Sequence, residues 1–306
     1  MKTRHFLKKV AGQHRLYIMM IPMLVAVTLF SYIPLSGWAM AFTDYQIGGS
    51  LFGGKFVGFR HFEYFFTQAA DSFYVLRNTL VINLSSLAIN LVSACAFAIL
   101  LNEVRTSWLR RVVQSISFFP FFISWVITYT LFNTFLSMQT GVLNVVLKDL
   151  GLIDTGINFL GDPNYSWGVI IFVGFWKSIG YNSVIFLAAI SGIEQEQYEA
   201  ASIDGATHMQ KIRFITIPAL APTLAVLLIM NSGWIFNSNF EEFNLFSNSV
   251  NWQKMEVLDV YVYRYGLKML DYSYATAVGI IKTAASLIMF FTVNIVAKRV
   301  NGRSLI

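Results

Sequence analysis

Amide and aromatic side chains recur at helical spacing inside the apolar runs of this sequence of 306 residues. In and just after the run at about 215–236, Asn231, Trp234 and Asn237 (or Ser238) stand at positions i, i+3 and i+6 (or i+7). On a helix this spacing places the side chains on one face. Amides can hydrogen-bond hydroxyl groups and an aromatic ring can cover the flat face of a ligand, so this face could line a path for a polar solute.

The run at about 165–190 holds a second candidate group, made of two aromatic residues, a charge and an amide: Trp176, Lys177, Tyr181 and Asn182. A charge at membrane depth is costly and usually faces a cavity or a partner. Lys177 could therefore neutralise an acidic sugar such as a uronate, or donate hydrogen bonds to neutral hydroxyls. Lys282 lies in the run at about 274–297, where it indicates either an ion pair or a water-filled lumen. We include it among the candidate residues of the substrate path.

The run at about 78–101 repeats the polar pattern with Asn83, Ser86 and Asn90. Asn and Ser in membrane helices often serve only to hydrogen-bond a neighbouring helix. We therefore interpret these three residues as packing contacts rather than ligand contacts.

Other kinds of active site have little support. Residues 49–55 read GSLFGGK, which matches a phosphate-loop spacing, but Phe56 stands where the magnesium-binding Ser or Thr is needed. The four histidines show no metal-ligand spacing, and the single cysteine, Cys95, lies in an apolar run. No nucleophile elbow or carboxylate pair stands out. We therefore expect neither an enzyme nor a bound metal.

The composition indicates a membrane protein. Hydrophobic residues make up 56% of the chain and charged residues 12%, whereas about a quarter of the residues in soluble proteins are charged. Six apolar runs approach the ~20 residues that cross a bilayer; they lie at about 16–40, 78–101, 112–136, 165–190, 215–236 and 274–297. We therefore predict an all-α polytopic membrane protein with six transmembrane helices, forming one domain over residues 1–306.

The distribution of basic residues predicts the orientation. With the N-terminus inside, thirteen of the 22 Lys and Arg lie on the cytoplasmic side, seven outside and two within runs. This bias places both termini in the cytoplasm and explains the net charge of +6 without nucleic acid. The first run could be a signal peptide, but it is too long for a signal h-region and no cleavage site is evident.

A polar stretch at 194–222 lies between two apolar runs on the predicted cytoplasmic side. Its first part is rich in Glu, Gln and Ala, which favour a helix. Asp204 and Gly205 then form a turn or cap dipeptide, because Gly adopts positive φ without steric cost. A second helical piece follows, and Pro218 restricts the backbone where the apolar run begins. The stretch predicts two short helices with a bend.

This stretch resembles the "EAA" loop of bacterial ABC-importer permeases. The usual pattern is E-A-A, three residues, G, nine residues, I-x-L-P, and the only departure is Ile217 in place of Leu. The resemblance implies that residues 194–214 couple the permease to an ATPase. The residues that match or adjoin the motif are Glu199, Ala200, Ala201, Asp204, Gly205, Ala206 and Pro218.

The resemblance extends over nearly the whole chain. Residues 32–34 (YIP), 41–45 (AFTDY) and 57–62 (VGFRHF) are similar to the start of maltose-type carbohydrate permeases, and residues 261–267 (YVYRYGL) and 272–277 (YSYATA) to their last outer loop and span. The LplB-like oligosaccharide branch is the most similar. The resemblance implies a type I ABC-importer permease (MetI-like) fold in the bacterial cytoplasmic membrane.

The family also implies a set of partners: a second homologous permease subunit, an ATP-binding subunit dimer and an external sugar-binding lipoprotein. No cofactor is then expected in this chain, because ATP and magnesium are bound by the ATPase. Oligosaccharide is the expected substrate, with another polar solute such as glycerol phosphate as an alternative. A gradient-driven secondary transporter is a second alternative. Such a transporter is expected to carry carboxylates within its spans to couple ions, and no run here has Asp or Glu at its middle, which weighs against this alternative.

Overall fold

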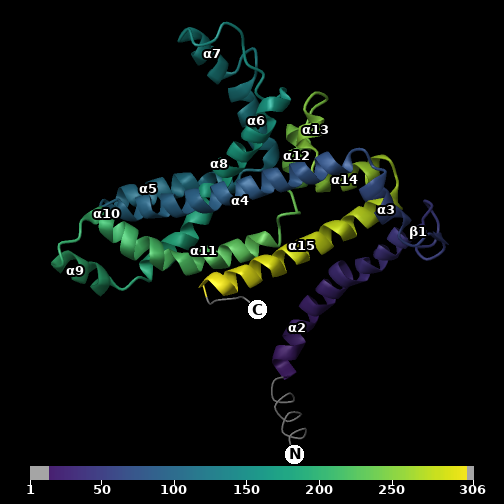
Figure 1. Cartoon of the computed structure of the whole chain (residues 1–306), viewed down its shortest axis with the longest axis horizontal. Coiled ribbons are helices and arrows are strands. Elements are labelled where there is room, and N and C mark those ends of the chain that lie inside the picture. Colours follow the sequence, from purple (N-terminus) through teal and green to yellow (C-terminus); the bar gives the residue numbers. More distant parts are fainter. Residues whose placement is uncertain (1–13, 302–306) are drawn as a thin grey trace, which may run out of the picture. The chain divides into compact units, whose positions relative to one another are not determined.

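The computed structural model describes residues 14–301, and nearly all of the regular structure in this part of the chain is helical (Figure 1). Five helical stretches are long and apolar enough to cross a membrane: Arg15–Phe42, Ser72–Glu103, Pro163–Ser191, His208–Ser232 and Tyr272–Arg299. A bent pair, Ser107–Phe122 and Trp125–Leu136, makes a sixth candidate if it is counted as one span. The described residues thus agree with the expected all-helical architecture of about six spans.

The elements follow one another along the chain from α2 to α15. The first half holds α2 (His14–Val27), η1 (Thr28–Tyr32), η2 (Ile33–Phe42), β1 (Thr43–Asp44), β2 (Lys55–Phe56), α3 (Arg60–Thr67), α4 (Ser72–Glu103), α5 (Ser107–Phe118), η3 (Phe119–Phe122), α6 (Trp125–Leu136) and α7 (Val142–Asp149). The second half holds α8 (Pro163–Ser191), α9 (Gln195–Ile203), α10 (His208–Lys211), η4 (Ile212–Thr216), α11 (Ile217–Ser232), α12 (Phe240–Phe246), α13 (Trp252–Met255), α14 (Leu258–Tyr263), η5 (Arg264–Lys268) and α15 (Tyr272–Asn301).

The chain divides into two compact units, of which the first comprises residues 1–68 and 264–280. Within it, β1 pairs antiparallel with β2, with Asp44 opposite Lys55. The GSLFGGK segment occupies the end of the intervening loop and the first residue of β2, so its glycines belong to a β-hairpin and not to a loop that opens a helix. Figure 1 shows this small hairpin beside α3.

The second unit, residues 69–263 and 281–306, contains the longest helices. α4 and α8 pack along one another and α11 packs against both, as Figure 1 shows. Their shared apolar core includes Leu91, Ala98, Phe186 and Leu220. Small residues allow close approach of membrane helices: a Cβ on Gly180 would lie only 2.0 Å from the backbone oxygen of Ser117.

The third predicted span is broken. α5 continues into the short 3-10 segment η3 and ends at Phe122, and α6 begins at Trp125 after a bend of 107°. Pro120 lies in η3, and Ser124 caps the new helix by accepting a hydrogen bond from the backbone nitrogen of Ile127 at 3.3 Å. A proline followed by a capping serine explains why one apolar run forms two helices.

The fifth predicted span also differs from the sequence expectation of about 215–236. Its helix begins earlier, at His208, and ends at Ser232. The side chains of Asn231 and Ser232 donate to the backbone oxygens of Leu227 and Ile229 at 2.7 Å. Such local bonds compete with helix propagation, and Gly233 follows with its low helix propensity.

Candidate functional site

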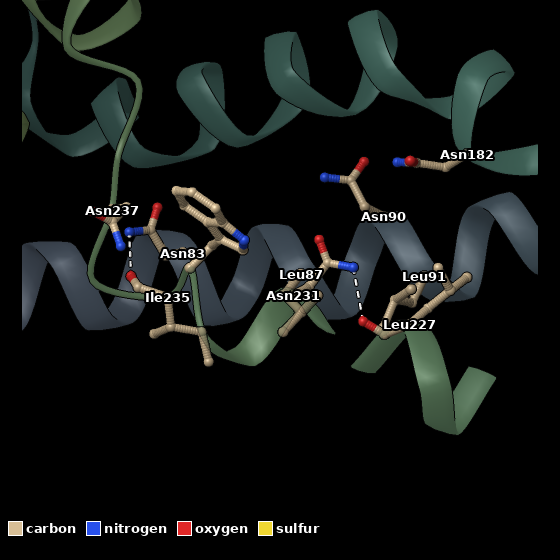
Figure 2. Close-up of a pocket in the computed structure, with 10 residues that line it drawn as sticks. Asn83, Leu87, Asn90, Leu91, Asn182, Leu227, Asn231, Ile235 and Asn237 are labelled. Atoms are coloured by element: carbon tan, nitrogen blue, oxygen red, sulfur yellow. Dashed lines mark hydrogen bonds between the residues drawn. The ribbon is translucent and has the colours of Figure 1, made fainter. Parts of the chain in front are cut away.

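A cavity of about 190 Å³ lies in the second unit between α4, α8, α11 and the irregular segment that follows α11. Its lining consists of five asparagines, one tryptophan and four aliphatic residues: Asn83, Asn90, Asn182, Asn231, Asn237, Trp234, Leu87, Leu91, Leu227 and Ile235. Figure 2 shows the asparagine side chains carried by these separate elements. The lining thus combines amide and apolar side chains and contains no ionisable one.

Asn83 and Asn90 of α4 fix two walls of the cavity. The Asn83 amide donates to the backbone oxygen of Ile235 at 2.6 Å and to the hydroxyl of Ser238 at 2.9 Å. The Asn90 carbonyl accepts from the hydroxyl of Ser178 on α8 at 2.7 Å. Asn90 thus makes the predicted contact with a neighbouring helix, whereas Asn83 bonds the irregular segment after α11. Both residues also line the cavity, which the sequence pattern did not indicate.

Asn231, Trp234 and Asn237 line the cavity together, but they do not lie on one helical face as their spacing predicted. Only Asn231 belongs to α11. Trp234 and Asn237 follow the helix in turn structure, where the backbone nitrogens of both bond to carbonyls three residues earlier. Trp234 is 69% exposed, so its ring surface is available to a ligand.

Among the candidates on α8, Asn182 lines the cavity, whereas Trp176, Lys177 and Tyr181 are engaged elsewhere. Trp176 packs edge-on against Phe132 with ring centroids 5.4 Å apart. Tyr181 stacks on Phe121 at 4.0 Å. Asn182 therefore lies at the cavity together with Asn231, Trp234 and Asn237. Trp176 and Tyr181 instead contact aromatic residues of the broken third span.

Lys177 is buried at the break in the third span. Its ammonium donates to the backbone oxygens of Pro120 at 3.0 Å and Phe121 at 3.2 Å, and also to that of Ile123. The last carbonyls of a helix have no intrahelical donor, and in a membrane such groups must be satisfied by the protein. Lys177 therefore caps the end of η3, a role that the sequence pattern did not indicate.

Lys282 forms an ion pair with Asp259 of α14, with its ammonium 2.5 Å from one carboxylate oxygen. Both side chains are largely buried, at 17% and 20% exposure. Of the two expectations for Lys282, the structure thus shows the ion pair.

Glu242 of α12 lies outside the candidate spans, and its carboxyl group is buried although the residue as a whole is partly exposed. Burial raises its pKa to about 8, and the Lys177 ammonium partly opposes this rise. The carboxyl also lies close to α8, since a Cβ on Gly174 would be 3.6 Å from a Glu242 carboxyl oxygen. The raised pKa favours the protonated form of Glu242 near neutral pH.

The polar stretch at 194–222 forms the predicted pair of short helices, α9 and α10, which lie together at one end of the second unit (Figure 1). Gly205 has φ +75°, and open space surrounds the place where a Cβ would lie. Glycine is needed here for its backbone conformation, because other residues adopt this φ only at a cost. Asp204 and Gly205 thus form the predicted bend.

Side-chain hydrogen bonds join α9 to α10 and to η4, and a further pair caps α10. The hydroxyls of Tyr198 and Thr216 lie 2.9 Å apart, and the Lys211 ammonium donates to the hydroxyl of Ser202 at 2.5 Å. Thr207 and Gln210 form a capping box at the start of α10. These hydrogen bonds hold α9 and α10 in a defined arrangement.

The outer surface of this helix pair is exposed and partly apolar. Ile203 is 88% exposed and Phe214 66%. A hollow of about 300 Å³ lies between the helices and is lined by residues of the motif and its neighbours: Ala201, Asp204, Gly205, Ala206, Gln210, Lys211, Phe214 and Ile215. Glu199 and Ala200 on α9 are exposed, and Pro218 stands in the first turn of α11, also exposed.

Comparisons with known proteins agree with this architecture. Residues 91–302 match the family model described as "Binding-protein-dependent transport system inner membrane component". Protein LplB of Bacillus subtilis (strain 168) is 36% identical over 290 residues, which cover 95% of this chain and 90% of LplB. The polygalacturonan/rhamnogalacturonan transport system permease protein YteP of the same organism is 36% identical over 298 residues, covering 97% and 92%.

A solved structure is similar over the whole fold. It is a bacterial alginate ABC transporter in complex with an alginate pentasaccharide-bound periplasmic protein. One of its chains is 34% identical to this chain with a TM-score of 0.89, and the alignment covers 97% of this chain and 99% of the other.

Fold and comparisons together define an all-helical, multi-pass permease of the inner membrane. The chain belongs to the family of binding-protein-dependent transport system inner membrane components, the permeases of ABC importers. It is a transport component and not an enzyme. The predicted family, fold class and location in the membrane are confirmed.

Proposed function

We propose that this chain forms half of a translocation pathway for oligosaccharides delivered by an external solute-binding protein. The observation that carries the proposal is the cavity lined by five asparagines and Trp234. Each amide offers both a donor and an acceptor, which suits the hydroxyl groups of a sugar, and the exposed indole offers a flat apolar face. The named substrates of YteP and of the alginate transporter are carbohydrates as well.

The cavity recognises hydroxyl groups without using charge. No ionisable residue lines it, Lys177 is occupied by three backbone carbonyls, and Lys282 is paired with Asp259. Of the two hypotheses for Lys177, the recognition of an acidic sugar therefore has no support from its position. An acidic oligosaccharide would find its counter-charges on another subunit or in solvent.

The helix pair α9–α10 is the proposed coupling element to an ATPase. Glu199, Ala200, Ala201, Asp204, Gly205, Ala206 and Pro218 carry the motif of that element. The braces between the two helices support the transmission of force, and the exposed Ile203 and Phe214 offer apolar surface to a partner. The proposed complex contains this chain, a second homologous permease, a dimer of ATP-binding subunits and a sugar-binding lipoprotein, with both termini of this chain in the cytoplasm.

Uptake of oligosaccharides by cells that produce the whole importer tests the proposal. Asn231→Leu removes one amide from the cavity, and Asn133→Leu makes the same change at an exposed position of α6 outside it. We expect Asn231→Leu to reduce uptake by about fivefold or more, in keeping with roughly 1–3 kcal/mol for an unsatisfied polar partner, and Asn133→Leu to leave it unchanged. Equal uptake by both variants would contradict the assignment of the cavity.

A further inference from the structure

The wall of the cavity beyond α11 is irregular backbone, which we call the segment 233–239. It lies between Ser232, the last residue of α11, and Phe240, the first residue of α12. Irregular backbone at membrane depth is tolerated only where it is buried in protein or lines a water-filled cavity. Its backbone groups then need partners from neighbouring elements, and two of these partners can be identified.

The first partner is Asn83, whose amide donates to the backbone oxygen of Ile235 at 2.6 Å (Figure 2). The second is Asp259, whose carboxylate accepts from the backbone nitrogen of Ser238 at 2.7 Å. The other oxygen of the same carboxylate binds the Lys282 ammonium at 2.5 Å. Asp259 thus joins the segment 233–239 to α15.

A further contact ties the segment to the same face of α15. The Asn237 amide donates to the hydroxyl of Ser286 at 3.4 Å. Ser286 stands four residues after Lys282, so both side chains leave one face of the helix. Two points of α15 therefore hold the segment, and Asn237 and Ile235 of that segment line the cavity.

A largely buried ion pair is weak evidence for stability in itself, because desolvation offsets most of the attraction. Buried charges in a membrane protein are costly and are usually functional. Here the pair has a definite structural consequence: it holds a carboxylate at the one place where the Ser238 backbone nitrogen needs an acceptor.

We propose that Asp259 and Lys282 are positioning residues of the substrate path: Lys282 orients the Asp259 carboxylate, which fixes the segment 233–239 and so places Trp234 and Asn237 at the cavity. Neither residue lines the cavity. Both act through the backbone of the segment. This role rests on the proposed function insofar as the cavity is taken as the substrate path.

Thiol accessibility tests the role without requiring transport. Cys95 is the only cysteine of the chain, so Cys95→Ala gives a background without thiols. Ile235→Cys then places a thiol in the segment at a position that is 4% exposed in the native protein, and Ile229→Cys places one at a 2% exposed position of α11 as the control. The probe is a membrane-impermeant thiol reagent with a quaternary ammonium group, applied to membranes that contain the complete importer.

Two double variants separate fixation of the segment from charge. Asp259→Asn with Lys282→Gln keeps an acceptor for the Ser238 backbone nitrogen, whereas Asp259→Leu with Lys282→Met removes it. Neither variant leaves an unpaired buried charge, and replacing a buried ion pair by apolar residues is often neutral for stability. The two variants therefore differ chiefly in the anchor of the segment.

We expect the thiol introduced by Ile235→Cys to react about tenfold faster in the apolar variant than in the amide variant, which corresponds to about 1.4 kcal/mol of local stability. The thiol introduced by Ile229→Cys should react equally in both. Equal rates for the thiol at position 235 would overturn the proposal.

If the apolar variant fails to assemble, Asp259→Glu moves the carboxylate by one methylene group. Faster labelling of the thiol at position 235 then supports the proposal, and an unchanged rate overturns it. A loss of uptake with an unchanged labelling rate would likewise overturn the positioning role. Faster labelling with normal uptake would support the positioning role and would contradict the assignment of the cavity as the substrate path.

Discussion

The hydroxyls of Tyr198 and Thr216 lie 2.9 Å apart and join α9 to the segment that leads into α11. Thr216 is buried at 4% exposure. In the proposed coupling, we therefore expect a movement of α9 to be passed to the base of α11, whose far end carries Asn231 at the cavity. This link connects the proposed ATPase contact with the proposed substrate path.

Loss of this link should weaken coupling. Tyr198→Phe removes one hydroxyl and leaves Thr216 without its partner, at a cost of about 1 kcal/mol. We expect substrate-stimulated ATPase activity of the purified importer to fall several-fold while the basal activity stays the same. Tyr165→Phe, at an exposed tyrosine on α8, serves as the control. Stimulation of Tyr198→Phe at the level of this control would contradict a role in transmission.

The bend at Gly205 should tolerate asparagine better than valine. The site has φ +75° and free space for a side chain, so the cost of substitution comes from the backbone and not from a clash. Asn adopts this conformation readily, whereas a β-branched residue does so at a cost of the order of 1–2 kcal/mol. We expect Gly205→Val to insert in the membrane but to abolish uptake, and Gly205→Asn to retain most of it. Equal activity of the two variants would refute the requirement for this bend.

Lys177 should matter for assembly and not for the choice of substrate. Lys177→Met leaves three backbone carbonyls without their donor, and an unsatisfied group costs about 1–3 kcal/mol where it is buried. We expect the solubilised protein to melt at a lower temperature, and uptake of neutral and acidic oligosaccharides to fall by the same factor. Lys148→Met, at an exposed position of α7, should change neither. A selective loss of acidic substrates would restore the charge-recognition hypothesis.

Glu242 should make the stability of the protein depend on pH. Burial raises the pKa of this carboxyl from 4.5 to about 8, so between these values the folded protein keeps a proton that the unfolded chain releases. The free energy of unfolding contributed by Glu242 therefore falls as the pH rises through this window. Glu242→Gln should flatten the pH dependence of the melting temperature between about pH 5 and pH 8. An unchanged slope would show that Glu242 is ionised in the folded protein.

The sequence predicted the parts of this protein that depend on local pattern. Apolar runs and basic residues indicated the spans, and the spacing of Glu199, Gly205 and Pro218 identified the helix pair. The asparagines of the runs were also recognised as polar positions, because a polar side chain stands out against an apolar background. These features can be recognised from residues close together in the chain.

The partners in contacts between distant residues were not identified from the sequence. The capping of η3 by Lys177 joins residues more than fifty positions apart. The hydrogen bond from Ser238 to Asp259 joins residues that α12 and α13 separate in the chain.

Two helix boundaries did have a local signal in the sequence. At the break before α6 the signal is a proline followed by a capping serine, Ser124. The end of α11 at Ser232 had one too, because Gly233 follows it directly.

Photochemical cross-linking during turnover tests the central claim most directly. An oligosaccharide that the importer takes up, carrying a diazirine group, is irradiated while purified importer in lipid vesicles hydrolyses ATP, and the labelled peptides are identified by mass spectrometry. We expect label on the peptides that contain Asn231, Trp234 and Asn237 or Asn83 and Asn90, and its disappearance when unlabelled sugar is in excess. Competable label confined to peptides outside the cavity would contradict the proposed path.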